Sequence, residues 1–331
     1  MNSTNQVRRT LNTLLLAGLL MPALPLDVHA QDDFPTRTVT IVLPYPPGGL
    51  ADAVSRRLAH RLSEIWKVSV VVDNKPGAAG LMGANLVAKA PADGYNLLFT
   101  IPETLSISKA AGLGSGFDPV DDFQPISLVA LSSTVLTVPA ASPHKTFKDF
   151  IAFARQNPGK LNFGVQGVGS SFHLALEQLK AISGSDITAV PYKGAAPAMV
   201  DLLAGRIDGM IVSTSVTIPY VQSGKLRVIA MASKERVPQM PDVPTIAELG
   251  YPAYDAPVGL GVLVRAGTPK TIVHKLSTDI LRVMHESAIV EWLATVAAVT
   301  SNHTPEEFKA RIRREVQSYG QLIEKAGIKF E

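Results

Sequence analysis

Strand-like and helix-like segments alternate along most of this chain, and this alternation constrains the fold more than any other feature. A β-branched run at 38–43 is followed by apolar residues at helical spacing from Leu50 to Ile65. The pattern recurs, with further strands expected at 68–72, 95–100, 135–138, 161–165, 187–190, 209–212 and 259–264, and further helices at 81–90, 147–156, 171–182, 195–204, 271–284, 288–296 and 305–325. Such alternation predicts parallel sheets with helical crossovers.

The alternation divides into two series, which predicts two lobes of α/β structure. The first series reaches about Leu131, and the second runs from there to about Ala256, before a last strand and a long helical tail. A chain of 331 residues is also long enough for two hydrophobic cores. Two such lobes imply a cleft between them, because ligands of open α/β sheets bind beyond the carboxyl ends of the strands.

Residues 1–30 have the pattern of a signal peptide. Arg8 and Arg9 precede an apolar run at 14–26, and Ala30 stands before Gln31 at the expected cleavage point. A membrane anchor would need about 20 continuous apolar residues, whereas prolines interrupt this run. The arginine pair fits the twin-arginine route and ordinary export, and we favour the ordinary route. With 0 cysteines, the chain is expected to have neither disulfides nor a lipid anchor, and the periplasm is the expected compartment.

Composition and motifs argue against several other classes of protein. The net charge is +3, and the densest basic run, 311–314, lies in a predicted amphipathic helix with glutamates, so nucleic-acid binding is not expected. The glycines of 77–83 and 164–169 match neither a dinucleotide-binding fingerprint nor a P-loop. The histidines are scattered without a metal-binding pair. We therefore expect no metal and no cofactor.

The stretch PYPPGGLAD at 44–52 joins a predicted strand to a predicted helix. Gly48 and Gly49 leave the first backbone N–H groups of that helix uncovered, and the positive end of the helix dipole points outward. The turn therefore suits an anion, although a glycine pair is equally compatible with a tight turn alone. Asp52 falls in the first helical turn, where a carboxylate is a common cap.

Two loops of the second series repeat this geometry. The segment 162–173, NFGVQGVGSSFH, is again a strand, a glycine loop and a helix start, where Ser170 and Ser171 suit helix capping. Ser171 and His173 are two residues apart and point in different directions on a helix, which disfavours a nucleophile–base pair. The loop 191–194 provides a further helix start, at which backbone amides are the expected contacts.

Seven segments carry a family pattern: YPPGGLAD (45–52), VVDNKPGAAGLMGANLVAKAPADGYNLLF (71–99), DDFQPISLVA (121–130), VPYKGAAPAMVDLLAGRID (190–208), PDVPTIAELGYP (241–252), RAGTPKTIVHKL (265–276) and TPEEFKARI (304–312). In this order they resemble the tripartite tricarboxylate transporter receptor family, the Bug or TctC-type periplasmic solute-binding proteins. The resemblance runs from about Phe34 to the end of the chain.

The resemblance implies a two-lobe periplasmic binding protein fold, type II-like, in which each lobe is a mainly parallel sheet flanked by helices and two crossing strands form the hinge. Domain 1 would comprise 31–131 and 258–331, domain 2 would comprise 132–257, and the hinge would lie at about 130–136 and 256–263. Such proteins are not enzymes. The resemblance implies a monomeric receptor that closes on a small carboxylate and delivers it to large and small membrane permease subunits.

The resemblance also implies which residues contact the ligand. One carboxylate is expected to be held by backbone amides and ordered waters around the first glycine turn, because a bare backbone lets an anion approach closely. The expected contacts are Tyr45, Pro47, Gly48, Gly49, Leu50, Ala51, Asp52, Thr100, Pro102, Glu103, Gly167, Gly169, Ser170, Ser171, His173, Tyr192, Lys193, Gly194, Ala195, Ser213 and Thr214.

Three departures from the family pattern bear on the ligand. Ala51 stands where Thr or Ser is common, the loop 100–104 reads TIPET instead of a run of Ser, Thr and Gly, and the tryptophan common near Gly259 is missing. Glu103 would repel a second carboxylate and attract an ammonium group. We therefore expect a carboxylate ligand that also carries an amine or amide, unless Glu103 faces solvent.

Two other functions stay open at this point. A secreted hydrolase or other enzyme on a two-lobe scaffold would change its ligand chemically, whereas a receptor would not. An orphan binding protein that engages a signalling sensor would keep the binding site and exchange the permease for another partner.

Overall fold

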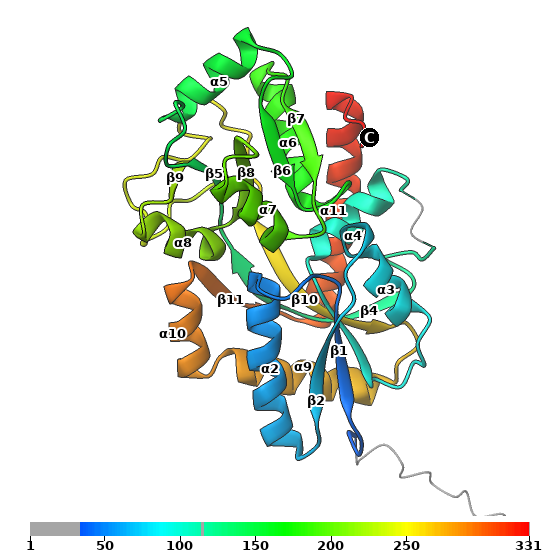
Figure 1. Cartoon of the computed structure of the whole chain (residues 1–331). Helices are drawn as coiled ribbons and strands as arrows, with labels where there is room; N and C mark the ends of the chain where they lie inside the picture. Colours follow the sequence, from blue (N-terminus) through cyan, green and yellow to red (C-terminus); the bar gives the residue numbers. More distant parts are fainter. Residues whose placement is uncertain (1–33, 114–115, 331) are drawn as a thin grey trace, which may run out of the picture. The chain divides into compact units, whose positions relative to one another are not determined.

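The computed structural model describes residues 34–113 and 116–330, and the predicted signal peptide at 1–30 lies outside them. The described residues form two β-sheets with helices packed against them (Figure 1). The first sheet has six strands in the order β11-β4-β10-β3-β1-β2. Its strands are β1 (Val39–Leu43), β2 (Val70–Asn74), β3 (Asn96–Thr100), β4 (Phe123–Ser132), β10 (Val258–Arg265) and β11 (Ala298–His303). We call this sheet and its helices lobe 1.

The second sheet has five strands in the order β7-β6-β8-β5-β9, and we call it and its helices lobe 2. Its strands are β5 (Thr134–Pro139), β6 (Asn162–Val165), β7 (Thr188–Pro191), β8 (Gly209–Ser213) and β9 (Leu226–Met231). The central β6 pairs parallel with β7 and β8, whereas β5 pairs antiparallel with β8 and β9.

Both sheets are mixed, which corrects the expectation of mainly parallel sheets. In lobe 1, β1 pairs parallel with β2 and β3, but β10 runs antiparallel to β3 and β4, and β11 runs antiparallel to β4. In lobe 1, β10 and β11 run against β1, β2, β3 and β4, and in lobe 2, β5 runs against the other four strands. β5 and β10 are the strands on which the chain enters each sheet from the other lobe. The strand–helix alternation predicted only the parallel part of each sheet.

The chain passes between the lobes twice, at adjacent places. β4 ends at Ser132 and β5 begins at Thr134, so a single residue separates strands of different sheets. The return passes through 232–257 into β10, which pairs with β4 from Val258 opposite Ser132 to Arg265 opposite Phe123. The two crossing segments therefore lie side by side.

The helices cover the sheets with their apolar faces. They are α2 (Leu50–Trp66), α3 (Leu81–Ala88), α4 (Pro102–Ala110), α9 (Lys270–Met284), α10 (Ser287–Thr295) and α11 (Pro305–Ala326) in lobe 1, with the short helix η1 (Ala78–Gly80), and α5 (Phe147–Gln156), α6 (Ser171–Ser183), α7 (Ala195–Leu203) and α8 (Thr214–Gln222) in lobe 2. The helical spacing seen in the sequence has its counterpart in α2, where Leu50, Val54, Leu58 and Leu62 are all buried.

Six elements were not predicted: β4, β9, β11, α4, α8 and η1. Proline stands in three of them and reads in sequence as a breaker. Pro102 occupies the first turn of α4, where its fixed φ suits a helix start, and Pro125 of β4 lies at a register shift in the pairing with β10. Pro219 lies inside α8, so tertiary packing overrides local preference there.

Candidate functional site

A pocket of about 40 Å³, which we call the inner chamber, lies between the lobes and is bordered by the starts of four helices. Its lining includes the N-cap residues of α2, α4, α7 and α8, namely Gly49, Ile101, Gly194 and Ser213. None of these four makes a side-chain hydrogen bond to its own helix. The positive ends of four helix dipoles therefore meet at one pocket without the side-chain caps that usually satisfy a helix start.

Three other helices have a side-chain cap, whereas α3, α9 and α10 lack one, like the four helices at the inner chamber. Thr146 caps α5, Ser170 caps α6 and Thr304 caps α11, each by accepting a backbone N–H of the first turn. The capping residues themselves line neither the inner chamber nor the outer chamber described below, although Phe172 in the first turn of α6 does line the inner chamber. The uncapped N–H groups of the four helix starts at the inner chamber can be satisfied by an anionic ligand.

Asp52 is the one charged side chain that lines the inner chamber, and the protein already satisfies it. Its carboxylate accepts the Gly48 N–H at 3.2 Å, the Arg56 Nε–H at 3.0 Å and the Asn74 amide at 3.2 Å. Burial by itself would raise the pKa of Asp52, but these hydrogen bonds hold it below its usual value. Asp52 therefore stays ionised and fixes the glycine turn in front of α2.

Tyr45 forms a rigid wall of the inner chamber. Its hydroxyl contacts Thr100 Oγ1 at 3.0 Å and accepts the Ile101 N–H at 3.2 Å, while its backbone oxygen accepts the Asn74 amide at 2.9 Å. The ring is thus held at both ends. Thr100, one of the expected ligand contacts, thus helps to position Tyr45.

A second cavity of about 390 Å³, the outer chamber, adjoins the inner one. Lobe 1 contributes Pro44, Tyr45, Gly77, Ala78, Ala79, Gly80, Leu81 and Leu113, and lobe 2 contributes Gln166, Gly167, Val168, Pro191, Tyr192 and Lys193. Tyr45 and Gln166 line both chambers.

Two glycines of lobe 2 lie directly against lobe 1. A Cβ atom on Gly194 would stand 2.8 Å from Cδ of Pro46, and a Cβ atom on Gly167 would stand 2.9 Å from Cα of Ala79. Both distances are shorter than real carbon contacts, so only glycine allows the lobes to approach this closely. Their φ angles, +140° for Gly194 and +108° for Gly167, also favour glycine.

The remaining expected contacts of the second loop hold the loop itself. His173 is buried; its backbone N–H donates to Ser170 Oγ at 3.1 Å and its Nδ1 accepts the Gly169 N–H at 3.2 Å. The Ser171 N–H donates across the cleft to Thr104 Oγ1 at 3.4 Å. His173 Nδ1 is therefore already occupied, and the ring is not paired with Ser171.

The positions of the expected contacts divide into three groups. The inner chamber is lined by Tyr45, Gly49, Leu50, Ala51, Asp52, Gly194, Ala195 and Ser213, and the outer chamber by Tyr45, Gly167, Tyr192 and Lys193. Neither chamber is lined by Pro47, Gly48, Thr100, Pro102, Glu103, Gly169, Ser170, Ser171, His173 or Thr214. Thr214 donates its hydroxyl to the backbone oxygen of Ser133 at 3.0 Å.

Glu103 does not have the role expected from the sequence. It is 1% exposed, and its Oε1 accepts the Gly259 N–H at 3.0 Å and an Arg311 N–H at 2.6 Å. The segment TIPET is not a loop: Thr100 ends β3, Ile101 is the N-cap of α4, and α4 begins at Pro102. Ile101 lines the chamber, while Glu103 lies against β10. The expectations that Glu103 receives a ligand ammonium or faces solvent are therefore wrong.

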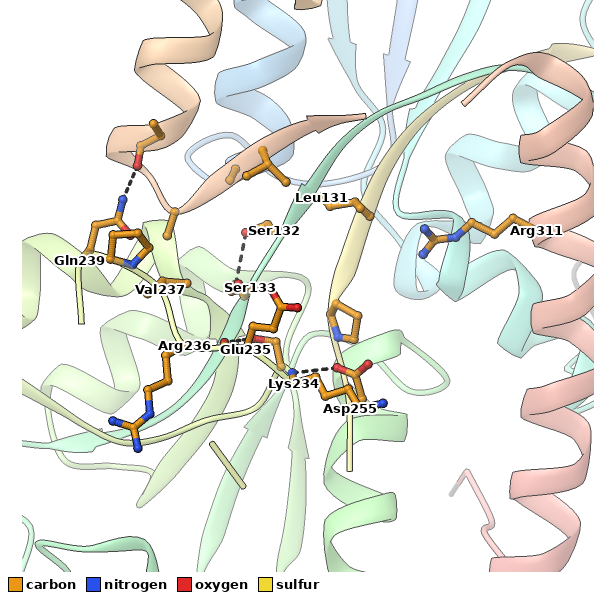
Figure 2. A pocket seen from close by; sticks show the side chains of 17 residues that line it. Leu131, Ser132, Ser133, Lys234, Glu235, Arg236, Val237, Gln239, Asp255 and Arg311 are labelled. Atoms are coloured by element: carbon orange, nitrogen blue, oxygen red, sulfur yellow. Dashed lines mark hydrogen bonds between the residues drawn. The ribbon is translucent and has the colours of Figure 1, made fainter. Parts of the chain in front are cut away.

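The end of β3 explains why a carboxylate stands at this place. β3 pairs with β10 only as far as Thr100 opposite Gly261, so the Gly259 N–H has no strand partner on that side. Glu103 supplies the missing acceptor. Arg311 also donates to Glu315 Oε1 at 2.6 Å, so that β10, α4 and α11 are linked behind the inner chamber. Figure 2 shows Arg311 extending from α11 toward β10.

This cluster predicts a pH dependence of stability. Burial and the nearby carboxylate of Glu315 raise the pKa of Glu103 from 4.5 to about 7, although Arg311 opposes the shift. The folded state then binds more protons than the unfolded state between these values, so the free energy of unfolding falls as the pH rises from 4.5 to about 7. The shift corresponds to about 3 kcal/mol. Glu103→Gln should remove this part of the slope, as measured by chemical denaturation at several pH values.

Glu324→Gln is the matched control, because Glu324 is an exposed carboxylate on α11. The control should keep the wild-type slope. Equal slopes for Glu103→Gln and the wild type would show that Glu103 does not titrate in this range.

Another cavity, of about 550 Å³, is lined by 131–133, where the chain crosses between the lobes, and by 233–239 (Figure 2). Pro257, just before β10, lines this cavity, whereas Val258 and Leu260 of β10 line the inner chamber. The Gln239 amide donates to the Ala294 backbone oxygen at its edge. The cavity is lined by charges of both signs and by no uncapped helix start of lobe 2, so it is the weaker candidate for an anion site.

Sequence reasoning missed the apolar half of both chambers. The sequence analysis did not name four apolar residues of the inner chamber as ligand contacts: Ile101, Phe172, Val258 and Leu260. An apolar residue in a strand or at a helix start has no local sequence feature that indicates a pocket. The segment 77–81 offered a signal: GAAG interrupts the apolar pattern, and Ala78 and Ala79 adopt positive φ in the structure.

Two mixed sheets joined by adjacent crossing segments, with a pocket lined by helix starts from both, define a two-lobe solute-binding protein. The family model for the tripartite tricarboxylate transporter family receptor matches residues 54–328. The chain belongs to this family, which confirms the resemblance seen in the sequence.

Curated relatives agree with this assignment. The UPF0065 protein in the tcbD-tcbE intergenic region of a Pseudomonas species is 36% identical over 93% of this chain and 93% of its own. BugT of Bordetella pertussis is 32% identical over 95% of each chain.

Solved structures agree as well. The periplasmic binding protein BugD has a TM-score of 0.85 at 32% identity, covering 89% of this chain and 99% of its own. An R. palustris protein with adipate has a TM-score of 0.85 at 34% identity, covering 89% and 99%. MatC from Rhodopseudomonas palustris with bound malate has a TM-score of 0.84 at 28% identity, covering 88% and 100%.

Family and structural neighbours are thus periplasmic solute-binding proteins. Among the residues that the structure describes, no helix has the length and apolar character needed to cross a bilayer. In the same part of the chain, no group of three or more His, Cys, Asp or Glu side chains is placed to hold a metal ion.

Proposed function

We propose that this protein is a periplasmic receptor that binds the carboxylate of a small solute in the inner chamber and delivers the solute to a tripartite membrane permease. One observation carries the proposal: four helix starts without side-chain caps converge on one pocket whose lining has no basic side chain. Backbone N–H groups and helix dipoles are then the source of attraction for an anion. The adipate and malate bound by two structural neighbours support a carboxylate.

Binding and closure are coupled in this proposal because lobe 1 supplies two of the helix starts and lobe 2 supplies the other two. A carboxylate that contacts all four is satisfied only when the lobes are together, so it shifts the population toward the closed form. The backbone turns at Ser133 and at 256–258, where the chain crosses between lobes, are the hinge of this motion.

We propose that the solute leaves chemically unchanged. Asp52 and Tyr45 are the titratable side chains of the inner chamber, and both already have hydrogen-bond partners within lobe 1. His173 is occupied by its own loop. No candidate nucleophile with an oriented base lines the pocket in the described part of the chain. We do not carry an ammonium group on the ligand forward, since Glu103 was its only support.

A thermal-shift screen of the mature chain against mono-, di- and tricarboxylates and their matched amides tests the proposal. A ligand at about 100 times its Kd should add about 2.7 kcal/mol to the free energy of unfolding. We expect a carboxylate to give this shift and its neutral amide to give little or none. Equal shifts for acid and amide, or no shift with any carboxylate, would contradict the proposal. Uptake of the same carboxylate by cells with and without the receptor tests delivery.

A further inference from the structure

The two chambers differ greatly in size. The inner chamber measures about 40 Å³, where one water molecule needs about 10–15 Å³ of such volume, so it accommodates a few water-sized groups, such as a carboxylate. The outer chamber measures about 390 Å³, within the range of about 300–1,000 Å³ that encloses an organic ligand. A ligand of more than a few heavy atoms must therefore place the rest of its mass outside the inner chamber.

The chambers adjoin along both chain segments that border them. On lobe 1, Tyr45 lines both chambers and Pro46 only the inner one. On lobe 2, Lys193 lines the outer chamber and Gly194 the inner one. The two chambers share Tyr45 and Gln166, and the close approach of Gly194 to Pro46 marks their division.

Gln166 is the side chain at this division that can move. Tyr45 is fixed by two hydrogen bonds of its hydroxyl, as described above. The side chain of Gln166, by contrast, has a single hydrogen-bond contact within the described part of the chain. Its amide lies 3.5 Å from the Ile211 backbone oxygen, at the limit of a hydrogen bond. Rotation of this side chain widens the passage between the chambers without disturbing a strong interaction.

The lining of the outer chamber is chiefly apolar. Its side chains include Pro44, Leu81, Leu113, Val168 and Pro191. The hydroxyl groups of its two tyrosines are both engaged: that of Tyr45 as above, and that of Tyr192 by donation to Asp201 at 2.7 Å. The carbon surfaces of the rings are what these tyrosines present to a ligand. Lys193 is the one charged residue of the lining, and it is exposed to solvent.

We infer that the ligand of this receptor is a carboxylate with an extended apolar body, aliphatic or aromatic, that lies in the outer chamber and passes beside Gln166. The inference rests on the proposed function, because it assumes that the carboxylate occupies the inner chamber. It makes the outer chamber the part of the site that selects among carboxylates, since the helix starts respond to any anion.

Isothermal titration calorimetry of the mature protein with butyrate, octanoate and 4-phenylbutyrate tests the inference. Burial of each methylene is worth about fourfold in affinity, so octanoate and 4-phenylbutyrate should bind at least about tenfold more tightly than butyrate. Val168→Asp places a carboxylate in the outer chamber and should weaken the two larger ligands by about tenfold or more while changing butyrate by less than about twofold.

Val200→Asp is the control, because Val200 is another exposed valine of lobe 2 and lines neither chamber. The exposed fraction is 58% for Val200 and 37% for Val168. It should leave all three affinities unchanged. If Val168→Asp lowers the thermal stability of the protein, Val168→Ser serves in its place, with a smaller loss expected for the larger ligands.

The outcomes separate this inference from the proposed function. If the protein binds none of the carboxylates, both the proposed function and this inference are contradicted. Butyrate that binds as tightly as octanoate and 4-phenylbutyrate would overturn the inference alone. The same holds if Val168→Asp weakens all three ligands equally.

Discussion

Arg311→Ala is expected to lower the free energy of unfolding by about 3–5 kcal/mol, because it leaves buried carboxylates without their cation. Arg311 donates to Glu103 and to Glu315, each at 2.6 Å, and the side chains of Arg311 and Glu103 are 19% and 2% exposed. Ser106 Oγ donates to the second oxygen of Glu315 at 3.1 Å, but Glu103 Oε2 is buried and has no partner among the described residues. Loss of the guanidinium is therefore not compensated by neighbours.

The loss in the free energy of unfolding caused by Arg311→Ala should be larger at pH 8 than at pH 5. Arg311 lowers the pKa of Glu103, so its removal raises that pKa further above 7 and makes the ionised form more costly. At pH 5 the Glu103 carboxyl is protonated in the folded state and needs the cation less. Chemical denaturation at the two pH values measures the difference.

Arg313→Ala is the matched control, because Arg313 is exposed on the same helix. Its effect should stay within about 0.5 kcal/mol at either pH. A loss for Arg311→Ala as small as that of the control would show that the Glu103–Arg311–Glu315 cluster does not stabilise the contact between α4, α11 and β10.

This cluster also illustrates what the sequence could not predict. Sequence analysis found the features that depend on local pattern. The glycine turn before α2 follows a predicted strand and precedes a segment of helical periodicity. In the structure this turn has no side-chain cap and borders the inner chamber. The environment of Glu103 was predicted wrongly because its partner Arg311 is 208 residues away in the sequence, and no local pattern indicates a contact at that separation. The proline before it also concealed the start of α4.

The outer chamber was hidden for a different reason. Its lobe 1 wall depends on η1, where Ala78 and Ala79 have φ angles of +46° and +54°. Alanine rarely adopts this conformation, so the interruption of the apolar pattern by GAAG was the one local indication of a bend, and it did not predict the positive φ angles. Contact with Gly167 of lobe 2 then brings the bend against the cleft. Local preference is overridden where two lobes meet, which is also where the ligand is expected to lie.

Gly167→Ala is expected to weaken carboxylate binding by about tenfold or more, equivalent to about 1.4 kcal/mol, by keeping the lobes apart. The added Cβ would stand 2.9 Å from both Cα and Cβ of Ala79. The neighbour is partly backbone, so no side-chain rotation relieves the contact, and separation of the lobes is the remaining response. Calorimetry with the carboxylate that gives the largest thermal shift measures the loss.

Backbone strain must be separated from this interlobe contact, and Gly250 provides the comparison. Its φ is +105°, against +108° for Gly167, but nothing lies within 4 Å of the position its Cβ would take. Both alanine variants should therefore lose similar stability, about 1 kcal/mol or more, from the positive φ alone. Only Gly167→Ala should lose affinity. Equal affinities for the two variants would mean that the ligand is held without close approach of Gly167 to Ala79, and the coupling of binding to closure would have to be abandoned.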